Sequence, residues 1–455
     1  MNDYYHFIGI GGIGMSGIAQ LMLQSGKKVS GSDLKESRST KELKQLGALI
    51  HIGHKAENLN GAKLVIYSSA VKEDNPEIIE ARKRNVPLMK RAEALANLMQ
   101  NKTVITVAGS HGKTTTTSLV SYLLIEAGLS PTAAIGGILK NIDNNARLGE
   151  GKYFVAEADE SDGSFLHYNP YYSIVTNIDR EHLDYYHDFD NEIKAFEEFI
   201  GKTDKTGCFF ACLDDENLKK IFKRYQGRKI SFGLDTHSDI SAEGIVMEGL
   251  SSEFECIYKG KRLGRFKLSL GGLHNVSNAL AVIALGLELG IDISFIKRTL
   301  ELYKGAGRRL EIKYDASGIT VIDDYAHHPT EIKATLSAAK QIRHKRLLCV
   351  FQPHRYSRTK LLLEELASSF DDCDQVIITD IYPASEPAIA GITGELLSER
   401  IKARYPAKEV FFLPKDKIRD FVIGRLVPGD IFLTLGAGDI VKISDELAEG
   451  FKRKS

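Results

Sequence analysis

A short glycine-containing loop in the second hundred residues has the side chains needed to hold nucleotide phosphates. A lysine at a helix start can reach the β- and γ-phosphates, a threonine hydroxyl can bind Mg²⁺, and backbone N–H groups can surround phosphate oxygens. The match to the general phosphate-loop pattern is incomplete, since Val107 occupies its first glycine position. The alternative is a capped helix with a surface lysine, and we favour the phosphate loop. Its residues are Gly109, Ser110, His111, Gly112, Lys113 and Thr114.

A second glycine loop lies near the N-terminus, directly after an expected strand and before an expected helix. Such a loop lets backbone N–H groups and a helix N-terminus approach a diphosphate. Alone it is typical of a dehydrogenase, but NAD and a UDP-sugar offer it the same diphosphate, and a tight turn without a ligand would also fit. A hydride-transfer enzyme has no use for a γ-phosphate site, so the other loop counts against a dehydrogenase. The pattern consists of Gly9, Gly11, Gly12 and Gly14, with Asp33 at the end of the next strand.

Carboxylates and a histidine follow two further expected strands. Glu157 to Asp162 (EADESD) comes after one buried strand, and Asn177 to Asp184, which includes His182, comes after the next. An acidic turn can simply be solvated, and a lone histidine is often structural. However, Mg²⁺ prefers carboxylate and phosphate oxygens, and open α/β sheets bind ligands at the carboxyl ends of their strands. We therefore expect Glu157 and His182 to converge on one cleft.

The elements that would position these residues predict an α/β protein of three domains. Apolar runs alternate with helix-like stretches from Tyr5 to about Met99, which favours a parallel, Rossmann-like unit. A central unit of the phosphate-loop ATPase type follows, and from about Lys229 to Leu270 its pattern becomes antiparallel around the turn Lys259-Gly260. In the last unit strands and helices alternate strictly, which predicts a doubly wound sheet. The expected domains are residues 1–99, 100–305 and 306–455.

Composition agrees with a folded cytoplasmic protein. Of 455 residues, 43% are hydrophobic and 26% charged, and 60 basic residues balance 60 acidic ones, so nucleic-acid and anionic-membrane binding are not expected. No apolar run approaches the roughly 18 residues that cross a bilayer, and no signal peptide precedes the first strand. The 5 cysteines are expected to be reduced and structural. No oligomeric state is predicted.

Taken together, these segments resemble the Mur ligase family. The resemblance also covers motifs in the third expected domain, so it extends along the whole chain in order. The matching segments are His6 to Ser16 (HFIGIGGIGMS), Gly109 to Thr117 (GSHGKTTTT), Ala156 to Phe165 (AEADESDGSF), Val175 to Asp184 (VTNIDREHLD), His274 to Ala279 (HNVSNA), Arg308-Arg309, Asp323 to Glu331 (DDYAHHPTE), Gln352 to Thr359 (QPHRYSRT) and Leu435 to Ile440 (LGAGDI).

The resemblance implies a Rossmann-like domain for a UDP-sugar, a central ATPase domain and a mobile C-terminal domain with an amino-acid site. It therefore assigns the first glycine loop to UDP. It implies a UDP-sugar site of Gly9, Gly11, Gly12, Gly14, Met15, Ser16, Asp33, Ser68 and Ser69. It implies an ATP site of Gly109, Ser110, His111, Gly112, Lys113, Thr114, Thr115, Asn275, Asn278, Arg309 and Asp324, with Mg²⁺ near Thr114, Glu157 and His182. It implies an amino-acid site of Tyr325, His327, His354, Arg355 and Arg358.

The implied reaction transfers the γ-phosphoryl group of ATP to the lactyl carboxylate of UDP-N-acetylmuramate, and L-alanine then attacks the acyl phosphate. The catalytic residues carried over are Lys113, Glu157, His182, Arg309 and His327. The amine must be neutral, so a base is expected, and His327 and His354 are both candidates. Within the family the alternative is a recycling ligase that joins a whole tripeptide to the same sugar, and the QPHRYSRT segment favours the alanine enzyme. Outside it, a nucleotide-binding regulator without ligase activity is the alternative.

Overall fold

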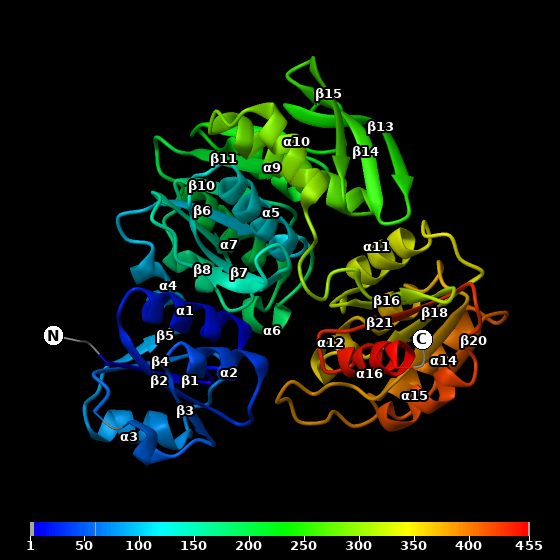
Figure 1. Ribbon diagram of the computed structural model, residues 1–455, viewed down its shortest axis with the longest axis horizontal. Helices are drawn as coiled ribbons and strands as arrows, with labels where there is room; N and C mark the ends of the chain where they lie inside the picture. Colours follow the sequence, from blue (N-terminus) through cyan, green and yellow to red (C-terminus); the bar gives the residue numbers. More distant parts are fainter. Residues whose placement is uncertain (1–3, 60, 454–455) are drawn as a thin grey trace. The chain divides into compact units, whose positions relative to one another are not determined.

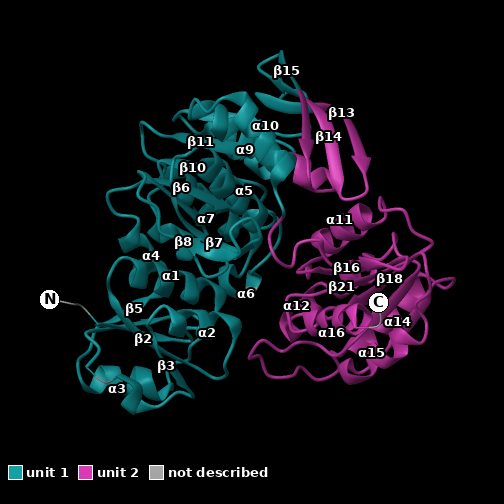
Figure 2. Cartoon of the chain, in the orientation of Figure 1, with its two compact units in different colours: residues 1–242, 256–264, 277–304 teal, residues 243–255, 265–276, 305–455 magenta. Residues whose placement is uncertain are grey.

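The computed structural model describes residues 4–59 and 61–453, which form three β-sheets connected and covered by helices (Figure 1). The expected three-domain α/β class is confirmed. The chain divides into two compact units (Figure 2). The first unit comprises residues 1–242, 256–264 and 277–304, and the second comprises residues 243–255, 265–276 and 305–455. No helix in the described ranges is long and apolar enough to cross a membrane.

The first sheet is parallel throughout, with strand order β3-β2-β1-β4-β5. Strand β1 lies between β2 and β4, so the order reverses beside it, and the first glycine loop leaves the carboxyl end of β1 at this switch point. The elements are β1 (Tyr4–Ile8), α1 (Ile13–Gln24), β2 (Lys28–Asp33), α2 (Arg38–Gln45), β3 (Leu49–Ile52), η1 (Ala56–Leu59), β4 (Leu64–Tyr67), α3 (Pro76–Lys83), β5 (Leu88–Lys90) and α4 (Arg91–Leu98).

A polar cluster is buried beside this sheet. The Glu77 side chain is fully buried and accepts hydrogen bonds from Ser32 Oγ at 2.6 Å and Asn58 Nδ2 at 2.5 Å. His54 Nδ1 lies 3.2 Å, and His6 Nε2 3.7 Å, from its two carboxylate oxygens. Burial opposes the charge, but the nearby His6 and the hydrogen bonds from Ser32 and Asn58 prevail and lower the pKa of Glu77 to about 2. The cluster therefore joins β1, β2, η1 and α3 through one buried carboxylate.

The second sheet has ten strands in the order β15-β14-β13-β12-β11-β10-β6-β9-β7-β8. Strand β6 lies between β10 and β9 and is parallel to both, so the phosphate loop also leaves its sheet at a switch point. The strands are β6 (Thr103–Ala108), β7 (Thr132–Leu139), β8 (Asn144–Arg147), β9 (Tyr153–Glu157), β10 (Tyr172–Val175), β11 (Cys208–Cys212), β12 (Lys229–Phe232), β13 (Ile240–Glu248), β14 (Ser251–Tyr258) and β15 (Lys261–Leu268). The helices are α5 (Lys113–Glu126), η2 (Ser164–His167), α6 (Leu183–Tyr186), α7 (Phe189–Gly201), α8 (Glu216–Arg224), α9 (Leu273–Glu288) and α10 (Ile293–Leu302).

Strand β12 does not belong to the antiparallel stretch that was expected from Lys229. Strand β12 is parallel to β11 and, at Phe232 and Ile240, to β13. The reason is that α8 carries the chain back between β11 and β12, and such a crossover produces parallel strands. The expected turn at Lys259-Gly260 is confirmed, since both residues have positive φ, at 48° and 77°. The sequence pattern also missed the antiparallel pair β7 and β8.

The third sheet has the order β16-β17-β21-β18-β19-β20. Its last five strands are parallel, but β16 is an antiparallel edge strand joined to β17 by a tight turn, so the predicted strict alternation of strands and helices is wrong there. Two buried apolar clusters fill the faces of this sheet. The elements are β16 (Glu311–Ala316), β17 (Ile319–Asp324), α11 (Pro329–Ala339), β18 (Arg346–Phe351), α12 (Tyr356–Leu361), α13 (Leu363–Ala367), β19 (Gln375–Ile378), α14 (Gly394–Arg404), β20 (Glu409–Phe412), α15 (Lys415–Ile423), β21 (Asp430–Leu435) and α16 (Val441–Lys452).

Candidate active site

The phosphate loop connects β6 to α5 and requires glycine at two positions. Gly109 has φ +126°, and a Cβ atom there would lie 2.2 Å from Thr176 Oγ1. Gly112 has φ +83°, and a Cβ atom there would lie 2.7 Å from Asn278 Oδ1. L-residues seldom adopt such φ values, and both sites are closed to a side chain. The loop is therefore held between the end of β10 and helix α9.

Lys113 begins α5 with its ammonium group surrounded by oxygens. Its Nζ donates to Gly109 O at 2.6 Å and Ser110 O at 3.1 Å, and forms an ion pair with Glu160 Oε1 at 2.7 Å. Burial opposes the charge, but the carboxylates of Glu160, Glu157 and Asp159 raise the pKa of Lys113 above its ordinary value. The residue therefore stays cationic, as a phosphate ligand must.

The two predicted oxygen ligands for Mg²⁺ lie together at the ends of adjacent strands. Thr114 Oγ1 donates to Glu157 Oε2 at 2.9 Å, and the Gly136 N–H donates to the same oxygen at 3.1 Å. Glu157 is the last residue of β9, beside β6, whose loop carries Thr114. A hydroxyl and a carboxylate at one sheet edge match the hard oxygen ligands that Mg²⁺ prefers.

His182 lies in a carboxylate cluster that the sequence analysis identified only in part. Its Nε2 lies 3.5 Å from Glu160 Oε1 and 3.3 Å from Glu181 Oε2, and one ligand atom from each of the three residues lies within 4.8 Å of the others. Burial opposes protonation, but hydrogen bonds to Glu160 and Glu181 prevail and raise the pKa of His182 to about 10. The residue adopts φ 53°, an uncommon left-handed conformation. Two carboxylates and an imidazole are a donor set that fits a divalent cation.

Glu160 connects the predicted residues and was itself missed. Its Oε1 contacts both Lys113 and His182, whereas its buried Oε2 has no hydrogen-bond partner in the described part of the chain. The signal in the sequence was the acidic run after β9, which did not indicate which of its carboxylates points inward. Glu181 was missed for the same reason, although it directly precedes His182.

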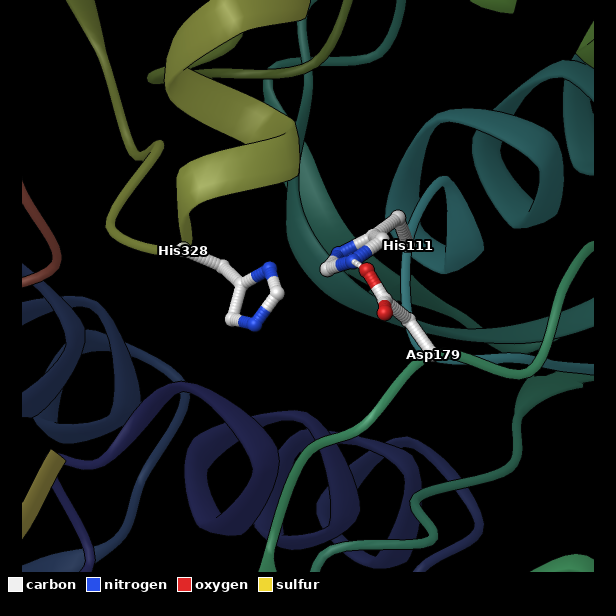
Figure 3. A group of neighbouring side chains, drawn as sticks. All are labelled: His111, Asp179 and His328. Carbon is white, nitrogen blue, oxygen red and sulfur yellow. Dashed lines mark hydrogen bonds and ion pairs between the residues drawn. The ribbon is translucent and has the colours of Figure 1, made fainter. Parts of the chain in front are cut away.

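Ser110 and His111 anchor the phosphate loop to the segment after β10. The Asp179 N–H donates to Ser110 Oγ at 2.8 Å, and His111 Nε2 lies 2.9 Å from Asp179 Oδ2. Figure 3 shows the His111 ring beside the Asp179 carboxylate. His328, drawn in the same figure, directly precedes α11 and belongs to the second unit. Thr115 is buried at the third position of α5. Ser110 and His111 therefore hold the phosphate loop against the segment that follows β10.

The two predicted adenine ligands lie three residues apart on α9. Asn278 packs against Gly112 of the phosphate loop, as the blocked Cβ position shows. Asn275 Nδ2 donates to Gly271 O at 2.7 Å within the second unit. Residues three apart on a helix share a face, so both amides lie on one side of α9.

Arg309 and Asp324 lie at the start of the third sheet. The buried Asp324 carboxylate accepts from Leu310 N at 2.7 Å and Ala326 N at 2.7 Å. Burial raises its pKa to about 6 against the opposing charge of Arg309. The Arg309 guanidinium lies 5.2 Å from the Tyr325 ring centroid and 3.7 Å from Glu331 Oε1. Asp324 thus fixes the backbone that presents Arg309.

Arg308 had no predicted role, yet it ties the loops of this sheet together. It pairs with the buried Asp323 carboxylate at 2.9 Å and donates to Gly436 O at 2.6 Å and Gly438 O at 3.1 Å. Its backbone has φ 60°. Arg308 therefore connects the end of β17 to the loop after β21, which the sequence analysis had matched without a function.

The predicted amino-acid residues meet in the second unit. The His327 ring lies 5.5 Å from the rings of both Tyr325 and His354, centroid to centroid. Arg358 Nη1 lies 3.3 Å from His354 Nδ1. Arg355 has φ 67°, and its Nε lies 3.9 Å from Glu386 Oε1. The loops after β17 and β18 thus reach each other across the end of β21, which separates the two strands. We call these five predicted residues the histidine cluster.

The first glycine loop packs closely against the side chains of Asp33 and Arg91. Gly9 has φ +77°, and the Gly11 N–H donates to Asp33 Oδ2 at 2.9 Å. A Cβ atom at Gly14 would lie 2.8 Å from Arg91 Nη1, and Arg91 forms an ion pair with Asp159 at 3.0 Å. Arg91 was not predicted, and it links this loop to the acidic turn of the second sheet.

The other predicted sugar-site residues lie around the same loop. Met15 is buried in α1, and Ser16 Oγ donates to Ile13 O at 3.0 Å. Ser68 is half-buried and Ser69 is exposed in the segment that follows β4. These positions lie beyond the carboxyl ends of β1 and β4, the two strands at the switch point.

Comparisons with known proteins show the family of the chain. The chain matches "Mur ligase family, catalytic domain" at residues 4–103, "Mur ligase middle domain" at residues 107–286 and "Mur ligase, glutamate ligase domain" at residues 308–438. The chain therefore belongs to the Mur ligase family.

Particular relatives are similar along the whole chain. The UDP-N-acetylmuramate–L-alanine ligase of Geotalea daltonii is 49% identical over 98% of this chain and 97% of its own. The crystal structure of the UDP-N-acetylmuramate–alanine ligase of Thermotoga maritima is 32% identical, covers 99% of this chain and 100% of its own, and has a TM-score of 0.86. That of a murein peptide ligase of Psychrobacter arcticus is 26% identical over 98% and 99%, with a TM-score of 0.73.

Proposed function

We propose that the protein joins L-alanine to the lactyl carboxylate of UDP-N-acetylmuramate, consuming ATP and forming an acyl phosphate, in the synthesis of peptidoglycan precursors. The observation that carries the proposal is the 49% identity, over 98% of the chain, to an alanine ligase. The proposed domains are residues 1–99 for the UDP-sugar, 100–305 for ATP and 306–455 for the amino acid. The proposed location is the cytoplasm, because the reaction consumes ATP.

In phosphoryl transfer, the first unit supplies the groups that bind the phosphates and the proposed Mg²⁺ ligands. Lys113 binds the phosphates as a cation, and the phosphate-loop N–H groups orient them. Thr114, Glu157 and His182 are the proposed Mg²⁺ ligands, and Glu160 and Glu181 lie close enough to support them. Bound Mg²⁺ supplies positive charge to phosphoryl oxygens. Asn275 and Asn278 offer donors and acceptors to adenine, and Arg309 and Asp324 belong to the nucleotide site from the third domain.

In amide formation, the histidine cluster holds the amino acid. A carboxylate fits the planar fork of an arginine, so Arg355 and Arg358 are the proposed carboxylate ligands. The pKa of His354, lowered to about 3 by burial and by the charges of His327 and the neighbouring arginines, keeps that imidazole neutral. The sheet and loops thus place cationic donors around a neutral ring, a suitable environment for one amino-acid carboxylate.

The alternative is a recycling ligase that accepts a whole tripeptide. This alternative has less support, because the murein peptide ligase structure of Psychrobacter arcticus is 26% identical, against 32% for the alanine ligase structure of Thermotoga maritima. Both alternatives use the same sugar and differ in the amine that enters.

The experiment that tests the proposal measures ATP-dependent phosphate release with UDP-N-acetylmuramate and one amine at a time. We expect turnover with L-alanine and much slower turnover with L-alanyl-D-glutamyl-diaminopimelate. Each product is identified by mass. Preferential use of the tripeptide would establish the alternative, and phosphate release without any amide product would indicate a nucleotide-binding regulator.

A further inference from the structure

The two histidines of the histidine cluster have different surroundings. His354 Nδ1 lies 3.3 Å from Arg358 Nη1, and arginine can only donate, so Nδ1 accepts and Nε2 carries the proton of the neutral ring. The His354 ring also stacks on Tyr382, with centroids 5.6 Å apart. Burial, with the charges of His327 and Arg358, lowers the pKa of His354 to about 3. His354 is therefore a weak base and a hydrogen-bond donor at neutral pH.

His327 has the opposite arrangement. Its Nδ1 lies 3.1 Å from Tyr325 O, which can only accept, and 3.3 Å from a carboxylate oxygen of Glu331. Nδ1 is therefore the protonated nitrogen, and Nε2 carries the lone pair of the neutral ring. The His327 side chain is 14% exposed. A carboxylate beside Nδ1 stabilises the imidazolium that forms when Nε2 takes a proton.

We infer that His327 is the general base that deprotonates the entering amino acid, and that Glu331 is a positioning residue that orients its ring and stabilises its charged form. The inference rests on the proposed function and names the base for its second step. It requires that Nδ1 donate to Tyr325 O and Glu331, the contacts observed in the second unit.

The amino acid enters as an ammonium ion and loses one proton to His327 Nε2. The neutral nitrogen forms a bond to the acyl carbon while the bond from that carbon to the phosphate oxygen breaks, and the phosphate leaves with the electron pair. The second proton of the nitrogen goes to the departing phosphate. The products are the amide, hydrogen phosphate and a protonated His327, which returns its proton to solvent.

Glu331 also has contacts that would serve structure alone. Its Oε2 accepts from His327 N at 3.1 Å and His328 N at 3.4 Å, which caps the first turn of α11, and its Oε1 lies 3.7 Å from Arg309. The charged and titratable groups that face His327 include Glu331 on α11, Tyr325 after β17, and His354 with Arg358 after β18. A test of the inference must separate the charge of Glu331 from its capping role.

The first experiment compares His327→Gln with wild type in two half-reactions. Acyl phosphate, trapped by borohydride reduction in the absence of alanine, should form at a near wild-type rate. Ligation of alanine should fall about 10²- to 10⁴-fold, the usual contribution of a general base. Hydroxylamine is already neutral at pH 7 and needs no base, so its conversion to the hydroxamate should persist. The matched control is His344→Gln, since His344 Nδ1 also contacts a carbonyl two residues earlier, Ile342 O at 2.5 Å, but lies outside the histidine cluster.

The second experiment follows alanine ligation against pH. Because wild type deprotonates the ammonium ion itself, its rate should level off near neutrality, whereas in His327→Gln the rate should rise about tenfold per pH unit as neutral alanine accumulates.

Glu331→Gln keeps an acceptor for the cap but removes the charge. It should lower the maximal rate roughly tenfold and shift the acid limb of the profile to lower pH, because the imidazolium loses its carboxylate. A purely structural role would leave that limb in place.

The outcomes separate the inference from the proposed function. If wild type makes no amide from alanine, the proposed function fails. If wild type does so and His327→Gln retains its rate and pH profile, His327 is not the base. Loss of acyl phosphate together with ligation would also overturn the inference, because it would assign His327 to the first step. An unchanged acid limb in Glu331→Gln would reduce Glu331 to a capping residue.

Discussion

Single side chains near the phosphate loop have more than one charged neighbour. Glu160 contacts the Lys113 ammonium at 2.7 Å and the His182 imidazole at 3.5 Å. The free-energy cost of burying a carboxylate is offset when the carboxylate lies between two cations, whereas any one of these groups alone would be costly to bury. Nucleotide phosphates could replace Glu160 as the partner of Lys113, because both offer anionic oxygens. The arrangement holds the lysine in place before a nucleotide binds.

Lys113→Ala should reduce ligation by about 10³-fold or more, since a phosphoryl-transfer clamp contributes several kcal/mol to the transition state. The fold should persist, because Glu160 keeps His182 as a partner. The measurement is initial ligation rate with thermal unfolding in parallel. Lys102→Ala is the matched control, since Lys102 Nζ donates to Gly151 O at 2.7 Å in the same domain, away from the loop. Near-normal turnover in folded Lys113→Ala would exclude the proposed role.

At the scale of elements, buried polar residues anchor the loops of the first and third sheets. In the first sheet, buried Glu77 joins the strands that flank the loop to η1 and α3. Asn75 caps α3 by accepting a hydrogen bond from Glu77 N at 2.9 Å. Glu77 therefore contributes its backbone to the helix cap and its side chain to the polar cluster. In the third sheet, Arg308 and Asp324 perform the equivalent function for the loops after β17 and β21.

Glu77→Gln should destabilise the protein in a pH-dependent way. The carboxyl pKa falls from 4.5 to about 2 on folding. Its stabilising contribution is therefore complete above pH 4.5 and is lost as the pH falls from there towards 2. We expect a loss of about 3 kcal/mol at pH 7 at most, given about 1.4 kcal/mol per pKa unit.

The measurement is urea unfolding of Glu77→Gln and wild type at several pH values between 7 and 3. The difference in unfolding free energy should shrink as the solution is acidified. Glu57→Gln, on the exposed surface of η1, is the control and should show little difference at any pH. A constant difference for Glu77→Gln would show that its charge does not contribute to folding.

At the scale of the whole molecule, the first and second sheets are connected within one compact unit. Asn145 Nδ2 of β8 donates to Ile13 O at 2.6 Å, and Gln20 Nε2 of α1 donates to Ala146 O at 3.1 Å. Arg91 connects the same two sheets through Asp159 and lies against the glycine loop at Gly14. The contact therefore runs from the proposed diphosphate loop to the acidic turn beside the proposed Mg²⁺ ligands.

Because Arg91 lies beside Gly14 of the proposed diphosphate loop, we expect its guanidinium to donate to the bound diphosphate. Arg91→Ala should therefore raise the KM for UDP-N-acetylmuramate about 10- to 100-fold, since a charge-assisted hydrogen bond contributes about 1.5 to 3 kcal/mol. The KM for ATP should change little, and the half-buried ion pair itself should contribute about 1 kcal/mol or less to stability. Arg38→Ala is the control, because Arg38 pairs with Asp143 at 2.8 Å across the same two sheets but on the exposed surface. Equal effects of both variants on the sugar KM would assign Arg91 to domain contact alone.

The sequence by itself determined the three-domain α/β class and predicted the places where chemistry can occur. Glycines such as Gly109 and Gly112, and the polar residues that follow buried strands, are local signals, because φ preference and hydrophobic alternation act over a few residues. The same signals located His327 and His354 after β17 and β18. The parallel pairing of β12 was missed because it depends on the crossover through α8, not on the strand's own residues.

Only the tertiary structure decided which side chains meet. Glu160 became the partner of both Lys113 and His182, and Arg91 the neighbour of Gly14, through contacts between residues far apart in the sequence. The difference between His327 and His354 likewise depends on a carbonyl, a carboxylate and an arginine that surround each ring. The physical reason is that burial and nearby charges set protonation and hydrogen bonding, and these depend on positions in space.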